Sequence, residues 1–412
     1  MKLVHLVRFD LIQDYRRMFA NEPVCIDDLE EVAQRVMPSG AWGYYDSGAN
    51  DEQTKHDNIH AFDQYRLHPR MLRDVSQIST ETTVLGERIR TPLGIAPCAM
   101  QKLAHPLGEQ AMSGAAAEHG SIMILSTYST TSMEKVMAQA KGNSYWMQLY
   151  VYENRQESEK LVRRAEAAGF KAIVLTVDAP VLGRRLVDAR NKFIPPPHLR
   201  LENFMDPEVA NAPEGYPPGT EYSEQETFGA VFGSNGDQSL SWENGIPWLK
   251  SITSLPIIVK GVLTAEDTRL AIQHGCAGVI VSNHGGRQLD GALATIDALP
   301  QVVEAAGDKI EVYLDGGVRK GSDIFKALAL GARAVFFARP ALWGLAYGGQ
   351  KGAKLALDLL QKEFELTMML TGTRNIAEID ESYVYQPTQR WVRYRPTTDA
   401  NGKKQRQLIA KL

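Results

Sequence analysis

The segment His284-Gly285-Gly286-Arg287 carries the residue types best suited to chemistry in this sequence. A histidine exchanges protons near neutral pH, and an arginine holds a carboxylate through two parallel hydrogen bonds. Together they suit the removal of a proton from an anionic 2-hydroxy acid. Asp178, near the end of another apolar run, is placed to orient the imidazole and stabilise its protonated form. We interpret His284 as a general base, although a single histidine is more often structural.

Two loops that each contain an arginine, one of them with two glycines, predict a phosphate site. They read DGGVR at 315–319 and ARP at 338–340. Glycines let backbone N–H groups approach an anion, and Arg319 and Arg339 supply planar donors. The alternative is tight-turn glycines beside surface arginines. Because no Walker signature is present, we assign the phosphate to a cofactor rather than to a transferable phosphoryl group.

Lys260 ends the apolar run PIIVK and needs an anion nearby. Negative charge that develops on a reduced flavin ring would supply one. A Schiff-base lysine and a structural lysine that reaches solvent remain open alternatives. The nine histidines show no ligand pairing such as H-x-x-x-H, so we predict no metal site.

Eight short apolar runs, each followed by a helical stretch, must position these residues. Consecutive apolar positions, as in AIVLTVD, are typical of parallel strands buried on both faces. Helical spacing recurs between them, for example at 157–168, 265–274 and 322–330. We predict an α/β protein with a (β/α)8 TIM barrel, whose chemistry gathers at the carboxyl ends of the strands. A doubly wound sheet is the alternative, but its G-x-G-x-x-G turn is absent. The runs are 93–97, 121–126, 145–150, 172–178, 256–261, 278–284, 311–317 and 334–339.

The remaining segments complete the predicted organisation. Residues 1–85 form an N-terminal helical extension, in which 27–37 is an amphipathic helix capped by Asp27 or Asp28 and stopped by Pro38. Residues 86–385 form the barrel, and 386–412 a C-terminal tail. The connection 193–241, after the fourth strand, is too long for an ordinary barrel loop and is predicted to be a lid. Between positions 201 and 240 it holds eight acidic residues and no lysine or arginine.

Composition excludes several classes of protein. The 412 residues carry 45 basic and 49 acidic side chains, a net charge of −4, so no basic field predicts a nucleic-acid partner. No apolar run is long enough to cross a bilayer, and we expect no membrane association. Three cysteines without a C-x-x-C spacing predict neither a disulfide framework nor a zinc site. The ending Ala410-Lys411-Leu412 is a variant of the S-K-L peroxisomal address, and without it we would expect a cytoplasmic protein.

Taken together, the motifs resemble those of the FMN-dependent L-2-hydroxy acid oxidase and dehydrogenase family, of the glycolate oxidase and lactate oxidase type. The resemblance runs from about residue 25 to 380. SNHGGRQLD is its most specific segment. The segments that carry it are YYDSGAND at 44–51, IAPCAM and QKLAHP within 95–106, QLYVY at 148–152, LTVDAPVLGRR at 175–185, VKGV at 259–262, SNHGGRQLD at 282–290, LDGGVRKG at 314–321 and ARP at 338–340.

The resemblance implies a role for each matching residue. His284 is the catalytic base, Asp178 its partner and Tyr150 a hydrogen-bond donor to the substrate hydroxyl. The substrate-binding residues are Tyr44, Arg287, Arg185 and Tyr128. FMN is the implied cofactor, and its expected contacts are Pro97, Cys98, Ala99, Ser126, Gln148, Thr176, Lys260, Ser282, Asp315, Gly317, Arg319, Ala338 and Arg339.

Two departures from the family pattern affect the expected activity. Tyr128 stands where glycolate oxidases often have tryptophan, which favours a lactate-type substrate, and Ala338 replaces a usual glycine. The resemblance implies oxidation of short L-2-hydroxy acids, lactate or glycolate, with oxygen reduced to hydrogen peroxide, in a homotetramer. A lactate 2-monooxygenase, a dehydrogenase with another acceptor and a non-catalytic flavin- or phosphate-binding barrel remain alternatives.

Overall fold

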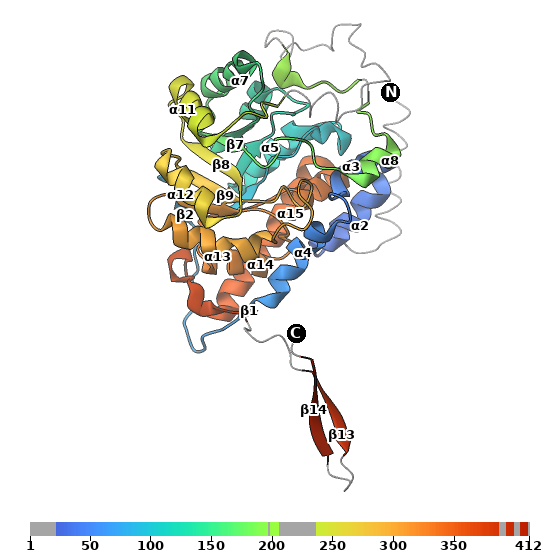
Figure 1. The fold of residues 1–412 in the computed structure, drawn as a ribbon, viewed down its shortest axis with the longest axis vertical. Helices are drawn as coiled ribbons and strands as arrows, with labels where there is room; N and C mark the ends of the chain where they lie inside the picture. The colour runs from blue at the N-terminus through green and yellow to red at the C-terminus, as the bar shows by residue number, and fades with distance from the viewer. Residues whose placement is uncertain (1–21, 197, 206–235, 387–392, 399–403, 411–412) are drawn as a thin grey trace.

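The computed structural model of the chain describes residues 22–196, 198–205, 236–386, 393–398 and 404–410. Eight parallel strands close into a barrel in the order β10-β11-β4-β5-β6-β7-β8-β9, inside a layer of helices (Figure 1). The last strand of the barrel, β11, pairs with the first, β4, with Val335 opposite Leu93, and this pairing closes the barrel. Each predicted run coincides with one strand, although β8 extends one residue beyond its run, so the predicted barrel is confirmed and the alternative of an open sheet is wrong. The strands are β4 (Leu93–Ile95), β5 (Ile122–Leu125), β6 (Tyr145–Leu149), β7 (Ala172–Thr176), β8 (Ile257–Val262), β9 (Gly278–Val281), β10 (Glu311–Leu314) and β11 (Ala334–Phe337).

The interior of the barrel is filled, which leaves its carboxyl end as the place for a site. Trp146, Tyr313 and Phe336 pack against one another with ring centroids 5.4 to 6.0 Å apart. At the opposite end lies the hairpin of β2 (Thr82–Val84) and β3 (Glu87–Ile89), whose Val84 and Ile89 join the same cluster. The aromatic layer and the hairpin therefore close the amino end of the barrel.

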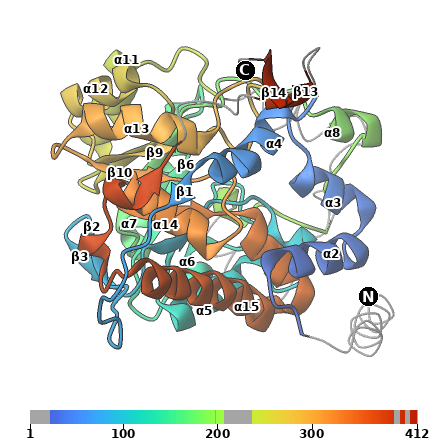
Figure 2. The ribbon, with the colours of Figure 1, turned by 90° about the horizontal axis from the view of Figure 1, so that it is seen from below.

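The helices predicted at 157–168, 265–274 and 322–330 are all present, with ends that differ by two residues at most. Outside the barrel, α15 packs against both α5 and α14 (Figure 2). α15 changes direction at Gly348 and Gly349, whose backbones are not helical. The helices around the barrel are α5 (Gly108–His119), α6 (Met133–Met137), α7 (Arg155–Ala168), α11 (Trp242–Ile252), α12 (Ala265–Gln273), α13 (Thr295–Ala306), α14 (Gly321–Ala329) and α15 (Arg339–Thr371).

Within residues 22–92, three α-helices precede the barrel, and they reach the ends of its strands. They are α2 (Ile26–Val36), α3 (Ser39–Asp46) and α4 (Gln53–His60). The predicted amphipathic helix is α2, whose first turn is capped by Asp28 through the backbone N–H groups of Val24 and Cys25, and which ends before Pro38. From α4, the amide of Asn58 exchanges two hydrogen bonds, of 2.8 and 2.7 Å, with the amide of Asn283 just after β9. The N-terminal segment thus fixes the end of a barrel strand.

The long connection after the fourth barrel strand and the C-terminal tail are only partly described. In the connection, α8 (Leu186–Asn191) and η3 (Glu202–Phe204) are described, whereas 206–235, the larger part of the predicted lid, lie outside the described residues. In the tail, β13 (Arg393–Thr398) and β14 (Lys404–Ala410) pair with each other, and the last two residues of the Ala-Lys-Leu ending also lie outside. Among the described residues, no helix has the length and apolar character needed to cross a bilayer.

Candidate active site

A hydrogen-bonded histidine and aspartate lie at the carboxyl end of the barrel. Nδ1 of His284, three residues after β9, is 2.9 Å from Oδ1 of Asp178, two residues after β7. This bond fixes the tautomer of a neutral imidazole with its proton on Nδ1, which leaves Nε2 as the proton acceptor. His284 lines the cavity at the barrel mouth. The pair therefore has the geometry of an oriented general base.

The backbone at His284 adopts a conformation that non-glycine residues rarely use. Its φ is +59°, and the two following glycines also have positive φ. A side chain in this region costs about 1–2 kcal/mol, so the surroundings must hold it there. Ser282 Oγ accepts the His284 N–H at 3.2 Å, and Oδ1 of Asn283 accepts the Gly286 N–H at 3.2 Å. The glycines after His284 make this turn possible, which places the imidazole over the strand ends.

Burial, together with two nearby cations, favours the neutral form of His284. Burial lowers the pKa of His284, Asp178 raises it, and the cations Lys260 and Arg185 lower it further, with a net value below the usual one. The pKa of Asp178 is raised by burial but lowered more strongly by His284 and Lys260, so this carboxyl is ionised. A neutral imidazole beside a carboxylate is ready to accept a proton at neutral pH.

Two arginines, Arg185 and Arg287, and two tyrosines, Tyr44 and Tyr150, line the same cavity. The guanidinium of Arg287 lies 5.1 Å from the centroid of the Tyr44 ring, and Nε of Arg185 donates to the Arg287 carbonyl at 3.4 Å. Burial lowers the pKa of Arg185 to about 10, which still leaves it protonated at neutral pH. Burial also raises the pKa of Tyr44 and Tyr150, so both phenols keep their protons and can donate. This group can hold a substrate carboxylate and hydroxyl.

Two buried polar atoms without a protein partner also line the cavity. They are Nε2 of Gln148 and Oγ1 of Thr176, at the ends of β6 and β7. Oε1 of Gln148 accepts the Thr127 N–H at 2.9 Å, which orients the amide. A buried group without a hydrogen bond is costly. The polar edge of a flavin ring carries carbonyl oxygens and ring nitrogens that pair with such groups, so the residues present fit FMN.

Lys260 has a protein anion beside it, which the sequence reasoning did not anticipate. Its Nζ is 3.2 Å from Oδ2 of Asp315 and 2.9 Å from Oγ of Ser282. Burial lowers the pKa of Lys260, but Asp315 and Asp178 raise it more, to a net value above the usual one. A Schiff-base lysine needs a lowered pKa, so the structure argues against that alternative. Lys260 remains a fixed cation at the barrel mouth.

The predicted phosphate loops meet on the same side of the cavity. Gly317 has a φ of +80°, and a Cβ there would lie 1.8 Å from the carbonyl oxygen of Asn58, so no larger residue fits. Arg319 and Arg339 both line the cavity. Arg339 also donates to the carbonyls of Tyr45, Asp46, Ser47 and Gly285 at 2.9 to 3.2 Å, contacts that the sequence does not indicate. Burial and two neighbouring arginines, Arg287 and Arg319, lower the pKa of Arg339 to about 9. An anion would relieve this repulsion.

The structure brings the predicted residues together. Of the residues assigned to catalysis, substrate or FMN, all but Asp178 and Ser282 line this cavity, and those two contact His284 and Lys260. Burial raises the pKa of Cys98 to about 12, so this thiol stays protonated. Among the described residues, no cluster of three or more His, Cys, Asp or Glu side chains is placed to hold a metal ion.

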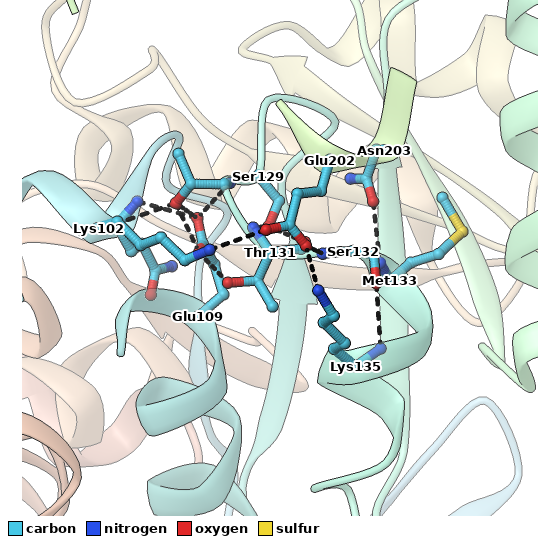
Figure 3. Close-up of polar contacts among 11 residues, drawn as sticks. Lys102, Glu109, Ser129, Thr131, Ser132, Met133, Lys135, Glu202 and Asn203 are labelled. Carbon is cyan, nitrogen blue, oxygen red and sulfur yellow. Dashed lines mark hydrogen bonds and ion pairs between the residues drawn. The ribbon is translucent and has the colours of Figure 1, made fainter. Parts of the chain in front are cut away.

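Glu202 helps to hold one side of the site in place, a role that the sequence did not predict. This carboxylate is 2% exposed and lies between two lysines, with 2.9 Å to Nζ of Lys102 and 3.1 Å to Nζ of Lys135 (Figure 3). It also accepts the Ser132 N–H at 3.0 Å. The only sequence signal is its place as the first acid of the acidic stretch, which does not identify its partners.

Asn203 and Phe204 extend this anchor to the site itself. The Asn203 amide donates to the carbonyls of Ser126 and Thr127 at 3.3 and 3.2 Å, at the end of β5. The Phe204 ring stacks on Tyr128, with centroids 6.1 Å apart. The residues 202–204, which we name the η3 anchor, therefore hold the Tyr128 side of the cavity.

Comparisons with known proteins agree with this site. Residues 33–386 match the model of the FMN-dependent dehydrogenase family. The chain is 48% identical to 2-hydroxyacid oxidase 1 of Homo sapiens, over 88% of this chain and 96% of the relative. It is 49% identical to glycolate oxidase of Spinacia oleracea, over 87% and 95%.

Solved structures show the same fold. A mandelate oxidase with (S)-4-hydroxymandelic acid superposes with a TM-score of 0.80 at 37% identity, covering 88% of this chain and 98% of that chain. A second mandelate oxidase structure, with a fluorinated hydroxyphenylpropionic acid, gives 0.77 at 37% identity over the same shares. The barrel, the donors suited to FMN and the family match lead to one conclusion: this chain belongs to the FMN-dependent dehydrogenase family.

Proposed function

We propose that the chain is an FMN-dependent oxidase of L-2-hydroxy acids, which converts them to 2-keto acids and reduces oxygen to hydrogen peroxide. One observation carries the proposal: the imidazole of His284, oriented by Asp178 at 2.9 Å, shares one cavity with Arg185, Arg287 and the Gln148 side chain, whose Nε2 has no hydrogen-bond partner among the described residues. The base, the carboxylate site and the flavin site are therefore adjacent. The names of the relatives, 2-hydroxyacid oxidase and glycolate oxidase, support the same activity.

Each residue has a defined part in the reaction. Arg185 and Arg287 bind the substrate carboxylate, and the protonated phenols of Tyr44 and Tyr150 donate hydrogen bonds to the substrate. His284 takes up a proton as the alcohol is oxidised, and Asp178 stabilises the imidazolium that forms. FMN, when bound, accepts the two electrons of the oxidation.

The FMN contacts follow from the fit of the cavity. Ser126, Gln148 and Thr176 would pair with the polar edge of the ring, and the Pro97-Cys98-Ala99 backbone lines the same cavity. Lys260, held in place by Asp315 and Ser282, would supply the positive charge that favours an anionic reduced ring. Gly317, Arg319, Ala338 and Arg339 would hold the phosphate.

Anaerobic mixing tests the proposed function. Purified protein is mixed with L-lactate or glycolate while the flavin absorbance near 450 nm is followed, and then air is admitted and peroxide is assayed. The proposal expects bleaching, followed by recovery with one peroxide per substrate oxidised. Bleaching that air barely reverses would make the chain a dehydrogenase with another acceptor. A flavin that stays oxidised with every hydroxy acid would refute catalysis of this type.

We infer in addition that the protein is a homotetramer imported into peroxisomes. The tripeptide Ala410-Lys411-Leu412 supports the location, because it resembles a peroxisomal address and peroxide formation suits that organelle. Light scattering on a sizing column measures the assembly, and a mass other than four chains would contradict it. Imaging of a fusion at the N-terminus, with and without the tripeptide, tests the location.

A further inference from the structure

A second cavity, of about 360 Å³, continues from the catalytic one. The two cavities share His284, Tyr128, Tyr150, Thr176, Leu182 and Arg185 as walls. From there the second cavity runs over the ends of β7 and β8 to α11, away from the residues that fit FMN. A small-molecule site in a protein has about 300–1,000 Å³, so this space is large enough for part of a substrate.

The far end of this cavity, which we name the α11 subsite, is lined mainly by apolar side chains. Leu240, Trp242 and Ile246 form its helix side, and Val151 and Val262 form its barrel side. Near the entrance, Leu182 is 40% exposed. Apolar walls of this kind stabilise an apolar occupant by about 25 cal/mol for each Å² removed from water.

The basic and acidic side chains of this second cavity lie on different parts of its wall. Arg185 and His284 lie at the catalytic end, and they are the only basic side chains among the described lining residues. Asp237 and Asp267 lie elsewhere on the wall; Asp237 is paired with Arg155 at 3.0 Å. The described residues of the α11 subsite therefore offer no cation to a second carboxylate of a substrate.

We propose that the α11 subsite binds the side chain of the substrate, and that this enzyme prefers L-2-hydroxy acids with an apolar side chain of four or more carbons. The inference rests on the proposed function, because the carboxylate must be held by Arg185 and Arg287 for the side chain to reach the subsite. The methyl group of lactate, next to the reacting carbon, would leave most of the subsite without apolar contact. Dicarboxylic hydroxy acids would be rejected because the apolar subsite would take their second carboxylate out of water, with no cation among the described subsite residues to pair with it.

A series of substrates with side chains of increasing length tests whether the α11 subsite binds the substrate side chain. We would compare kcat/KM for glycolate, L-lactate, L-2-hydroxybutanoate, L-2-hydroxyhexanoate and L-2-hydroxyoctanoate, with L-malate as the charged control. Each buried methylene is expected to raise kcat/KM by about threefold to fourfold, and malate is expected to react more slowly than hydroxybutanoate. A kcat/KM that stays constant or falls as the side chain becomes longer than that of lactate would overturn the proposed role of the subsite while leaving the proposed function intact. No reaction with any acid would instead refute the proposed function.

Two tryptophans of α11 provide a matched pair of variants. Trp242 lines the subsite, whereas Trp248, on the same helix, packs against Arg155 at 5.0 Å and is not part of the cavity wall. Trp242→Ala is expected to lower the ratio of kcat/KM for hydroxyoctanoate to that for lactate by about tenfold, and Trp248→Ala to leave this ratio unchanged. Equal ratios in the two variants would contradict the proposal.

A third variant covers the case in which loss of Trp242 disturbs the fold. Leu240→Trp adds volume to the subsite from a half-buried position. It should lower kcat/KM for hydroxyoctanoate at least tenfold more than for lactate, because a long side chain then meets the new ring. Unaltered use of hydroxyoctanoate by this variant would overturn the assignment.

Discussion

Replacement of Asp178 by asparagine tests the catalytic pair with little change in shape. The Asp178 carboxylate lies 2.9 Å from Nδ1 of His284, and it is the main group that raises the pKa of this buried imidazole. A hydrogen bond to a charged group contributes about 1.5–3 kcal/mol, which corresponds to a factor of about 10 to 150 in rate. Asp178→Asn removes this stabilisation from the imidazolium that forms during the reaction. We expect flavin reduction to slow by that factor.

The same variant should also move the pH profile in a defined direction. In the wild type, His284 must be neutral to act, so activity falls as pH decreases through its pKa, which lies below 6.5. Without Asp178, burial, Lys260 and Arg185 still lower the pKa of His284, and the main group that raises it is lost. The acid limb of the profile should therefore move to lower pH, even though the maximal rate falls.

Stopped-flow measurement of anaerobic flavin reduction between pH 5 and 9 gives both quantities. Asp290→Asn is the control, because Asp290 accepts backbone N–H groups of Asp51 and Thr54 at 3.0 and 2.9 Å and does not line the cavity. It should leave the acid limb where it is. A rate within threefold of the wild type for Asp178→Asn, or an acid limb at higher pH, would refute the account of the pair.

Three further predictions concern the cofactor and the anchor. Gln148→Leu should weaken FMN binding about tenfold, because the buried amide loses its role as a ring partner; titration of the apoprotein by flavin fluorescence measures this, and unchanged affinity would contradict the fit. Gly317→Ala should weaken FMN binding and lower thermal stability, because the new Cβ would lie 1.8 Å from the Asn58 carbonyl oxygen; a variant that matches the wild type in both would argue against the tight loop. Glu202→Gln should destabilise the protein by about 3 kcal/mol, since two buried ion pairs lose their anion. Urea unfolding checks the last prediction, with Glu159→Gln, an exposed pair with Arg163, expected to cost below about 0.5 kcal/mol, and equal losses in both variants would count against the η3 anchor.

The barrel and most of the site could be predicted from the sequence for a physical reason. Parallel strands buried on both faces leave uninterrupted apolar runs, and a polar residue at the end of such a run, such as Lys260, marks the barrel mouth. Because all eight strands point the same way, residues far apart in the chain, such as Asp178 and His284, meet at one end.

The features of the site that the sequence did not reveal depend on which residues form ion pairs in the folded chain and on backbone conformation. The pattern around Lys260 indicates a need for an anion but does not reveal that Asp315 supplies it. Likewise, Glu202 could pair with any lysine, and only the folded chain brings Lys102 and Lys135 to it. The positive φ of His284 depends on the hydrogen bonds that the backbone N–H groups of His284 and Gly286 donate to Ser282 and Asn283, which no periodicity encodes.

The most direct test of the central claim is anaerobic flavin reduction in His284→Ala. The variant removes the imidazole that contacts Asp178, while the Gln148, Thr176 and Lys260 side chains that fit FMN remain in place. Our account predicts a normal flavin spectrum and a rate of reduction by L-2-hydroxy acids that is lower by about 10²-fold or more. A variant that binds FMN normally and is reduced at a rate close to that of the wild type would contradict the assignment of His284 as the base.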